Sequence, residues 1–139
     1  LFLKMGSKSI YENEEEISSD ILIVKSLGIL PTLYADAQLA FVGGSLVNRG
    51  GHNIIEPAIA KCPFILGENY FNFKNIVESF INANATYIVK TPLDIFEIFC
   101  KTYKNQDNFR EDMIRNANTV VEKNIGATMR QLSLIRSSL

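Results

Sequence analysis

The chain has 139 residues, of which 47% are hydrophobic and 21% are charged. This length and composition are typical of one globular domain, so we expect a single domain over residues 1–139 with a sizeable core. The formal net charge of −1 excludes an overall basic field, and we predict no nucleic-acid partner. Cys62 and Cys100 stand in apolar surroundings without C-x-x-C spacing, so we expect buried, reduced thiols.

The predicted elements alternate between short apolar strands and amphipathic helices. In chain order they are a weak strand at 1–5, a strand at 20–24, a helix at 27–37, a strand at 39–43, a helix at 53–61, a strand at 63–67, a helix at 73–84, a strand at 86–89, a helix at 92–104, and two helices at roughly 107–124 and 126–138. The alternation predicts an α/β fold, a Rossmann-like parallel sheet with flanking helices and right-handed crossovers.

Two boundaries carry local signals. Thr91 as N-cap with Pro92 at the first helical position marks the start of the helix at 92–104. Gly126 is expected to separate the two closing helices.

No stretch is apolar for long enough to cross a bilayer, so we expect this piece of chain to be soluble.

Residues 43–57, "GGSLVNRGGHNIIEP", concentrate the chemistry of the chain. They leave a predicted strand and enter a predicted helix, which is where open α/β sheets bind ligands. Their four glycines, Gly43, Gly44, Gly50 and Gly51, allow tight turns and expose backbone N–H groups. A helix start adds a partial positive charge, so the segment could cradle a phosphate.

The polar residues of this segment have two interpretations. Arg49 could add a full charge to an anion site and His52 a directional donor. Asn53 followed three positions later by Glu56 is also a helix-capping box, with Pro57 in the first turn, so Glu56 could be purely structural. The spacing matches neither the dinucleotide fingerprint nor a Walker loop, and no cluster has metal-ligand spacing, so we predict no metal and no cofactor.

A second polar cluster follows the next predicted strand. It comprises residues 67–75, "GENYFNFKN", in which Asn72 and Lys74 could face the same anion as the glycine segment. Because consecutive parallel strands end at the same edge of a sheet, we expect the two loops to lie side by side. Phe71 and Phe73 are expected to pack into the core as a staple for the following helix.

The segment "FVGGSLVNRGGHNIIEPA" (41–58) resembles the bacterial 3-deoxy-D-manno-octulosonic acid (Kdo) transferases. These carry G-G-S-L-x-x-x-G-G-H-N-x-x-E-P-A, then a P-x-x-x-G strand and F-N-F-K, which match 63–67 and 71–74 here. The resemblance implies a GT-B glycosyltransferase, of which this chain would be most of the C-terminal, donor-binding half. The N-terminal acceptor domain, with the catalytic base, would be missing, so the resemblance implies no catalytic residue in this chain and an inactive fragment.

The implied donor is CMP-Kdo and the implied acceptor is a lipid A precursor at the cytoplasmic face of the inner membrane. The implied enzyme is metal-independent and inverting, with closing helices that pack back toward the cleft. Glu56 would hold the nucleotide ribose. The phosphate would be held by the glycine loop and the helix start, here Gly43, Gly44, Ser45, Gly51, His52 and Asn53.

Residues 101–139 contain seven Lys/Arg and four Asp/Glu. This excess of positive charge could favour association with a membrane surface, although a solvated helix face also accounts for it.

One segment departs from the family. Where these enzymes commonly have D-T-x-G-E-L, residues 25–30 read "KSLGIL", so that Lys25 and Ile29 replace acids. Two alternatives therefore remain: another GT-B protein that uses a UDP-sugar, which would need a larger phosphate site, or a non-catalytic nucleotide-binding module.

Overall fold

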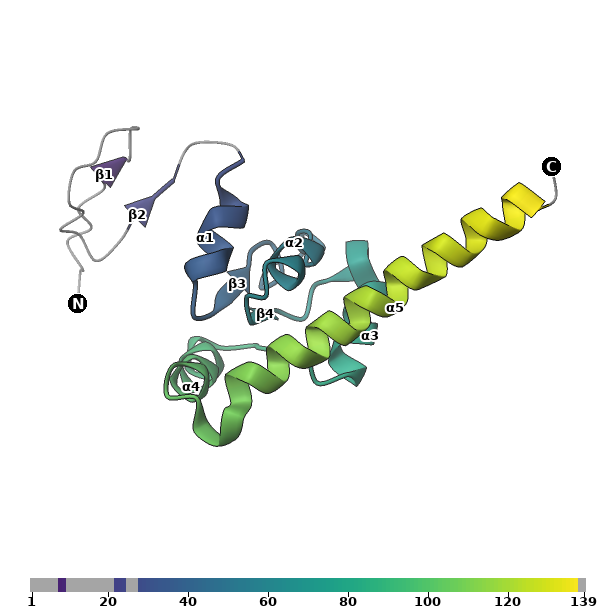
Figure 1. Ribbon diagram of the computed structural model, residues 1–139. Coiled ribbons are helices and arrows are strands. Elements are labelled where there is room, and N and C mark those ends of the chain that lie inside the picture. Colours follow the sequence, from purple (N-terminus) through teal and green to yellow (C-terminus); the bar gives the residue numbers. More distant parts are fainter. Residues whose placement is uncertain (1–7, 10–21, 25–27, 138–139) are drawn as a thin grey trace. The chain divides into compact units, whose positions relative to one another are not determined.

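The computed structural model describes residues 8–9, 22–24 and 28–137, with side chains described at 24 and 28–124 (Figure 1). The chain divides into two compact units, Leu1–Leu30 and Pro31–Leu139. In the first unit, β1 (Lys8–Ser9) and β2 (Leu22–Ile23) pair in parallel. The strand predicted at 20–24 is thus confirmed, and the one predicted at 1–5 lies outside the described residues. β1 was not predicted, because two polar residues carry no apolar pattern.

The second unit contains a three-stranded parallel sheet. Its strands are β3 (Ala40–Val42), β4 (Phe64–Leu66) and β5 (Thr86–Ile88), in the order β3-β4-β5. Each lies inside a predicted apolar run, so these three strand predictions and the predicted Rossmann-like α/β fold are confirmed. All three residues of β4 are buried. A central parallel strand is paired on both edges and covered on both faces, which explains its continuous apolar sequence.

Helices connect the strands and complete the unit. They are α1 (Leu30–Asp36), α2 (Ile55–Ile59), the 3-10 helix η1 (Phe71–Phe73), α3 (Lys74–Asn82), α4 (Pro92–Tyr103), the 3-10 helix η2 (Gln106–Asn108) and α5 (Phe109–Ser137). The helix α5 packs against α2, α3 and α4. The start of α4 is as predicted: Thr91 and Asp94 form a reciprocal capping box. The N–H groups of Lys90 and Thr91 donate to the Asp94 carboxylate and hold its pKa below the usual value.

The main core lies between the sheet and the helices α2, α3 and α5. Within it the rings of Phe64 and Phe80 meet edge to face with centroids 5.4 Å apart. Its buried members are Val42, Ile54, Ala58, Phe64, Leu66, Val77, Phe80, Ala85, Ala117 and Val120. Ile65 points to the opposite face of the sheet, where side chains of α4 line an apolar hollow of about 280 Å³. Both faces of β4 are therefore covered, as its sequence predicts.

Two sequence predictions about these helices are wrong. The chain does not break near Gly126, because α5 runs as one helix from Phe109 to Ser137 (Figure 1). A glycine inside a helix costs only about 1 kcal/mol relative to alanine, which does not by itself end a helix. Phe71 is 58% exposed and does not enter the core, whereas Phe73 is half-buried and packs against it. In the short 3-10 helix η1 the two rings leave on different sides.

The two cysteines differ in exposure, so the prediction of two buried thiols holds for Cys62 and is wrong for Cys100, which is only half-buried. Burial raises the pKa of the Cys62 thiol to about 11, against the opposing effect of Arg110. Because the thiolate is the nucleophile, Cys62 should be almost inert at pH 8. We expect iodoacetamide at that pH to alkylate Cys100 well before Cys62 in a mass-spectrometric time course. Labelling of Cys62 at the same rate would contradict this arrangement.

Candidate functional site

Two loops meet at the carboxyl edge of the sheet. The glycine loop, residues 43–54, follows β3, and the second loop, residues 67–73, follows β4. The Asn69 N–H donates to the Ser45 carbonyl at 2.9 Å, and the Asn72 N–H donates to the Gly50 carbonyl at 3.3 Å. The predicted adjacency of the two loops is therefore confirmed.

The glycines serve distinct purposes in this arrangement. Gly44, Gly50 and Gly51 have φ of 72°, 83° and 74°, in the left-handed region that other residues rarely adopt. At Gly50 an added Cβ would also lie 2.3 Å from the Asn72 amide nitrogen. Gly43 has neither restriction, since its Cβ position is 3.7 Å from the nearest atom, on the ring of His52. The backbone conformation of the loop thus requires glycine at three positions. Neither backbone conformation nor close packing explains the glycine at position 43.

Ser45 is completely buried between the two loops. Its hydroxyl donates to the Val42 carbonyl at 2.5 Å and accepts from the Gly67 N–H at 2.8 Å. Gly67 packs so closely on it that an added Cβ would lie 2.3 Å from the Ser45 carbonyl oxygen. The hydroxyl that sequence reasoning placed at a phosphate is therefore engaged inside the protein.

The two polar residues predicted around the second loop are also engaged. The Asn72 amide donates to the Arg49 carbonyl at 3.1 Å and so braces the glycine loop. Lys74 begins α3, where its ammonium lies 3.9 Å from the Glu78 carboxylate one turn later. Both residues are exposed; Asn72 contacts the glycine loop, whereas the described contact of Lys74 is with its own helix.

The remaining polar residues of the glycine loop face solvent. The His52 ring lies over Gly44, with its Nε2 3.3 Å from the position of an added Cβ. Arg49 and Asn53 are exposed as well, and so is Glu56 at the start of α2. Arg49, His52, Asn53 and Glu56 are thus exposed on one short stretch of chain, and among them the His52 ring lies against Gly43 and Gly44.

The predicted capping box takes a different form. The Asn53 side-chain oxygen accepts from the Ile55 N–H at 3.0 Å, and its amide donates to the Glu56 carboxylate at 3.1 Å. The two side chains therefore hold each other, and the N-cap position is Ile54, without a side-chain cap. Among described residues only one Glu56 oxygen, Oε1, has a hydrogen-bond partner. Glu56 is thus held by Asn53 through one oxygen while its side chain remains exposed, which is compatible with both interpretations of this residue.

The helix α2 is shorter than the predicted 53–61. Its five residues make about one and a half turns, so few peptide dipoles add up at its start. An anion at this loop would therefore depend mainly on the loop N–H groups and on Arg49 and His52 rather than on a long helix.

Sequence reasoning missed two features of this edge. Asn69 donates both its backbone N–H and its side-chain amide to the Ser45 carbonyl. Lys90, just after β5, forms a 2.7 Å ion pair with Glu68, just after β4, and this contact raises the pKa of Lys90. The sequence offered one signal for these residues, their position: Glu68, Asn69 and Lys90 each lie within three residues of the end of a strand.

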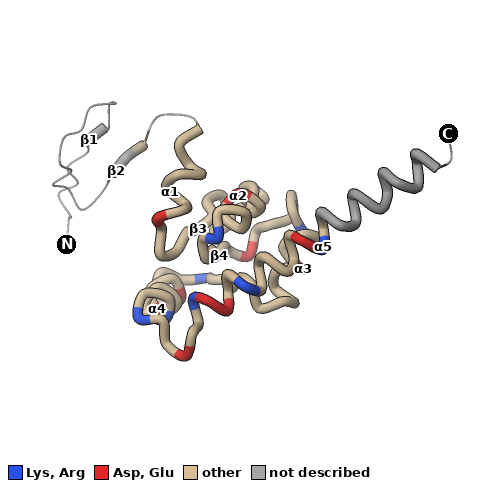
Figure 2. The backbone as a smooth tube through the Cα atoms, viewed as in Figure 1, with Lys and Arg blue, Asp and Glu red and all other residues tan. Residues whose placement is uncertain are grey.

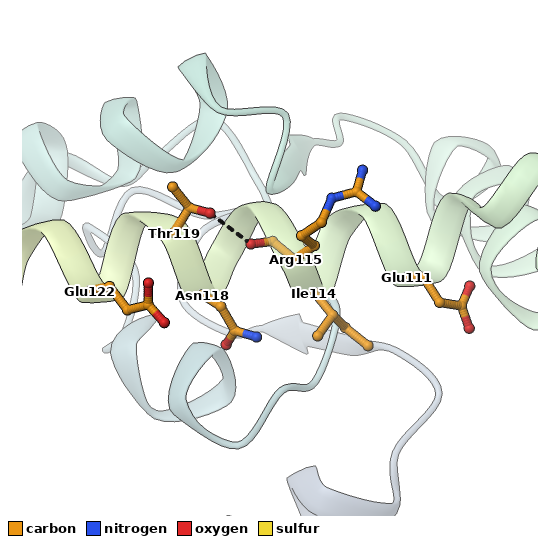
Figure 3. Close-up of a pocket in the computed structure, with 6 residues that line it drawn as sticks. All are labelled: Glu111, Ile114, Arg115, Asn118, Thr119 and Glu122. Carbon is orange, nitrogen blue, oxygen red and sulfur yellow. Dashed lines mark hydrogen bonds between the residues drawn. The ribbon is translucent and has the colours of Figure 1, made fainter.

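One other surface feature is confined to α5. A hollow of about 420 Å³ lies along a stripe of α5, and all of its lining residues come from that one helix (Figure 3). They are Glu111, Ile114, Arg115, Asn118, Thr119 and Glu122. Basic and acidic positions are interspersed along α4 and the described part of α5 (Figure 2). Within the described residues no group of three or more His, Cys, Asp or Glu could hold a metal ion.

No helix in the described part of the chain combines the length and the apolar character that crossing a membrane requires.

Comparisons with known proteins agree on one family. The chain is 33% identical over 122 residues to the 3-deoxy-D-manno-octulosonic acid transferase of Haemophilus influenzae, covering 88% of this chain and 29% of that protein. It is 44% identical over 66 residues to the transferase of the same name from Bordetella pertussis, covering 48% of this chain and 15% of that protein. The chain thus spans under a third of the length of these relatives. No family model matches the chain.

A solved structure extends the likeness to the fold. The crystal structure of the C-terminal CMP-Kdo binding domain of WaaA from Acinetobacter baumannii matches with a TM-score of 0.70 and 35% sequence identity. The match covers 75% of this chain and 54% of that one. Sequence and fold together identify this chain as a relative of the C-terminal domain of the Kdo transferases.

Proposed function

We propose that this chain is the donor-binding part of a glycosyltransferase that moves Kdo from CMP-Kdo to a lipid A precursor. The observation that carries the proposal is a set of three exposed polar residues, Arg49, His52 and Glu56, on the chain that follows β3, with the His52 ring lying against Gly43 and Gly44. It stands at the carboxyl edge of a parallel sheet, where such folds bind nucleotides. The motif that forms it is the one that resembles the family.

The exposed residues have separate tasks in this proposal. The carboxylate of the exposed Glu56, held by Asn53, accepts the ribose hydroxyls. The backbone of Gly43 and Gly44, with Arg49 and His52, receives the single phosphate of CMP. Fixed N–H donors and a guanidinium stabilise the negative charge that grows on the departing phosphate, so no metal is required.

The remaining chemistry belongs to parts outside this chain. An acceptor hydroxyl must lose a proton as the sugar is transferred, which calls for a general base. We place that base in an N-terminal domain of the longer protein, so the chain alone should be inactive and the transfer inverting. Because the proposed acceptor is a lipid, the longer protein would work at the cytoplasmic face of the inner membrane.

Calorimetric titration of the chain with CMP, UMP and UDP tests the proposal. We expect CMP to bind most tightly and Glu56→Ala to weaken it roughly tenfold or more, since a hydrogen bond to a charged group contributes about 1.5–3 kcal/mol. Glu97→Ala is the matched control: it removes an exposed glutamate from α4, and CMP binding should not change. A preference for UDP would assign the chain to a UDP-sugar enzyme. Binding of none of the three would contradict the proposal.

A further inference from the structure

We propose that Ser45 is a positioning residue rather than a donor ligand, and that with Asn69 it locks the glycine loop and the second loop into one preformed frame for the donor. This inference rests on the proposed function. It assigns a different role to one residue of the glycine motif and a new role to Asn69, which lies outside that motif.

The hydrogen-bonding capacity of the Ser45 hydroxyl carries the first step. A serine hydroxyl has one donor hydrogen and two acceptor lone pairs. Its hydrogen points to the Val42 carbonyl at the end of β3, and it accepts from the Gly67 N–H at the end of β4. The side chain has no exposed surface. To donate to a phosphate it would have to give up its bond to the Val42 carbonyl.

The backbone of Ser45 carries the second step. Its carbonyl accepts both the N–H of Asn69, at 2.9 Å, and the side-chain amide of Asn69, at 3.2 Å. The absence of a side chain at Gly67 is what allows this approach, because a Cβ there would lie 2.3 Å from the same carbonyl. Ser45 is thus joined to the second loop by three hydrogen bonds, two to Asn69 and one to Gly67.

The far end of the glycine loop is tied down separately. Asn72 donates its N–H to the Gly50 carbonyl and its side-chain amide to the Arg49 carbonyl. The Gly51 N–H donates to the Gly44 carbonyl at 3.2 Å and closes the loop on itself. Both ends of the glycine loop are therefore fixed by the second loop before any ligand arrives. A preformed site spends less binding free energy on ordering its own backbone, so loss of the lock should appear as weaker binding.

The test compares Ser45→Ala with the unmodified chain in two measurements. Hydrogen exchange of the Gly67 amide, followed by NMR without ligand, should become roughly tenfold faster, because this donor loses the Ser45 hydroxyl as its partner. CMP affinity, measured by calorimetry well below the melting temperature, should also fall roughly tenfold. Asn69→Ala removes only one bond of the lock and should give both effects to a smaller extent. It keeps the test decisive if Ser45→Ala does not fold.

Two control variants separate positioning from other roles. Thr86→Val removes a buried hydroxyl that donates to the Phe64 carbonyl at 2.7 Å, at the opposite end of β4 and β5. It should destabilise the fold to a similar extent without changing CMP affinity. Arg49→Ala removes a proposed phosphate contact and should weaken CMP without accelerating exchange at Gly67.

Three outcomes would overturn the inference. Unchanged exchange in Ser45→Ala would show that there is no lock. Weaker CMP binding without faster exchange would make Ser45 a ligand. An equal loss of CMP affinity in Thr86→Val would mean that Ser45 affects binding only through the overall stability of the fold. If the unmodified chain binds no CMP, the proposed function fails and the positioning role with it, whereas the exchange rates still decide whether the loops are locked.

Discussion

Gly67→Ala should destabilise the chain by about 3 kcal/mol, the upper end of the usual cost of overpacking a core. Its new Cβ would lie 2.3 Å from the Ser45 carbonyl oxygen and 2.7 Å from the Leu46 nitrogen. Both are backbone atoms, so no side-chain rotation relieves the contact. Since domains are stable by only about 5–15 kcal/mol, urea unfolding followed by circular dichroism should show a clearly lower midpoint.

Gly43→Ala is the matched control for this variant. Gly43 stands in the same loop system, but its φ is not in the left-handed region and its Cβ position has only the His52 ring at 3.7 Å. We expect its unfolding midpoint to stay close to that of the unmodified chain. Equal stability of the two variants would contradict the close packing of the second loop on Ser45.

Phe80→Ala should cost about 3–5 kcal/mol, as for other fully buried aromatic residues. Phe80 lies on α3 with no exposed surface, and its ring contacts Phe64 of the central strand edge to face. Truncation would leave a cavity between α3 and the sheet and would remove that aromatic pair. Thermal unfolding should show a lower midpoint and less cooperative loss of structure.

Phe71→Ala provides the comparison for Phe80, because it removes the same side chain from a residue that is 58% exposed. Surface substitutions of this kind usually change stability by no more than about 0.5 kcal/mol. A cost for Phe71 as large as that for Phe80 would mean that the Phe71 ring is buried, as the sequence suggested and the structure does not show.

The hydrogen bonds between the two loops limit which polar residues of the proposed site are exposed. Side-chain groups of Ser45, Asn69 and Asn72 form hydrogen bonds between the two loops. Arg49, His52 and Glu56 are exposed and lie close together in the sequence. A small charged patch on a braced loop suits a ligand with one phosphate and one ribose.

The amino-acid sequence determined the local structure of this protein. The apolar runs predicted β3, β4 and β5, most clearly β4, which is buried on both faces and is therefore apolar throughout. Thr91 and Pro92 predicted the start of α4, since capping depends on neighbours within one turn. The glycine motif predicted the location of the candidate site for the same reason: backbone freedom is a property of the residue itself.

Only the tertiary structure decided which polar groups remain available. Ser45 and Asn72 read like ligands, yet each is engaged by a residue more than twenty positions away, and no local pattern encodes such a partner. The continuity of α5 through Gly126 is another such outcome, because a glycine lowers helix stability without dictating where a helix ends. Hydrogen bonds and packing between segments distant in sequence depend on how the strands are placed side by side. That placement engages the Ser45 hydroxyl and the Asn72 amide in hydrogen bonds between the two loops and leaves Arg49, His52 and Glu56 exposed.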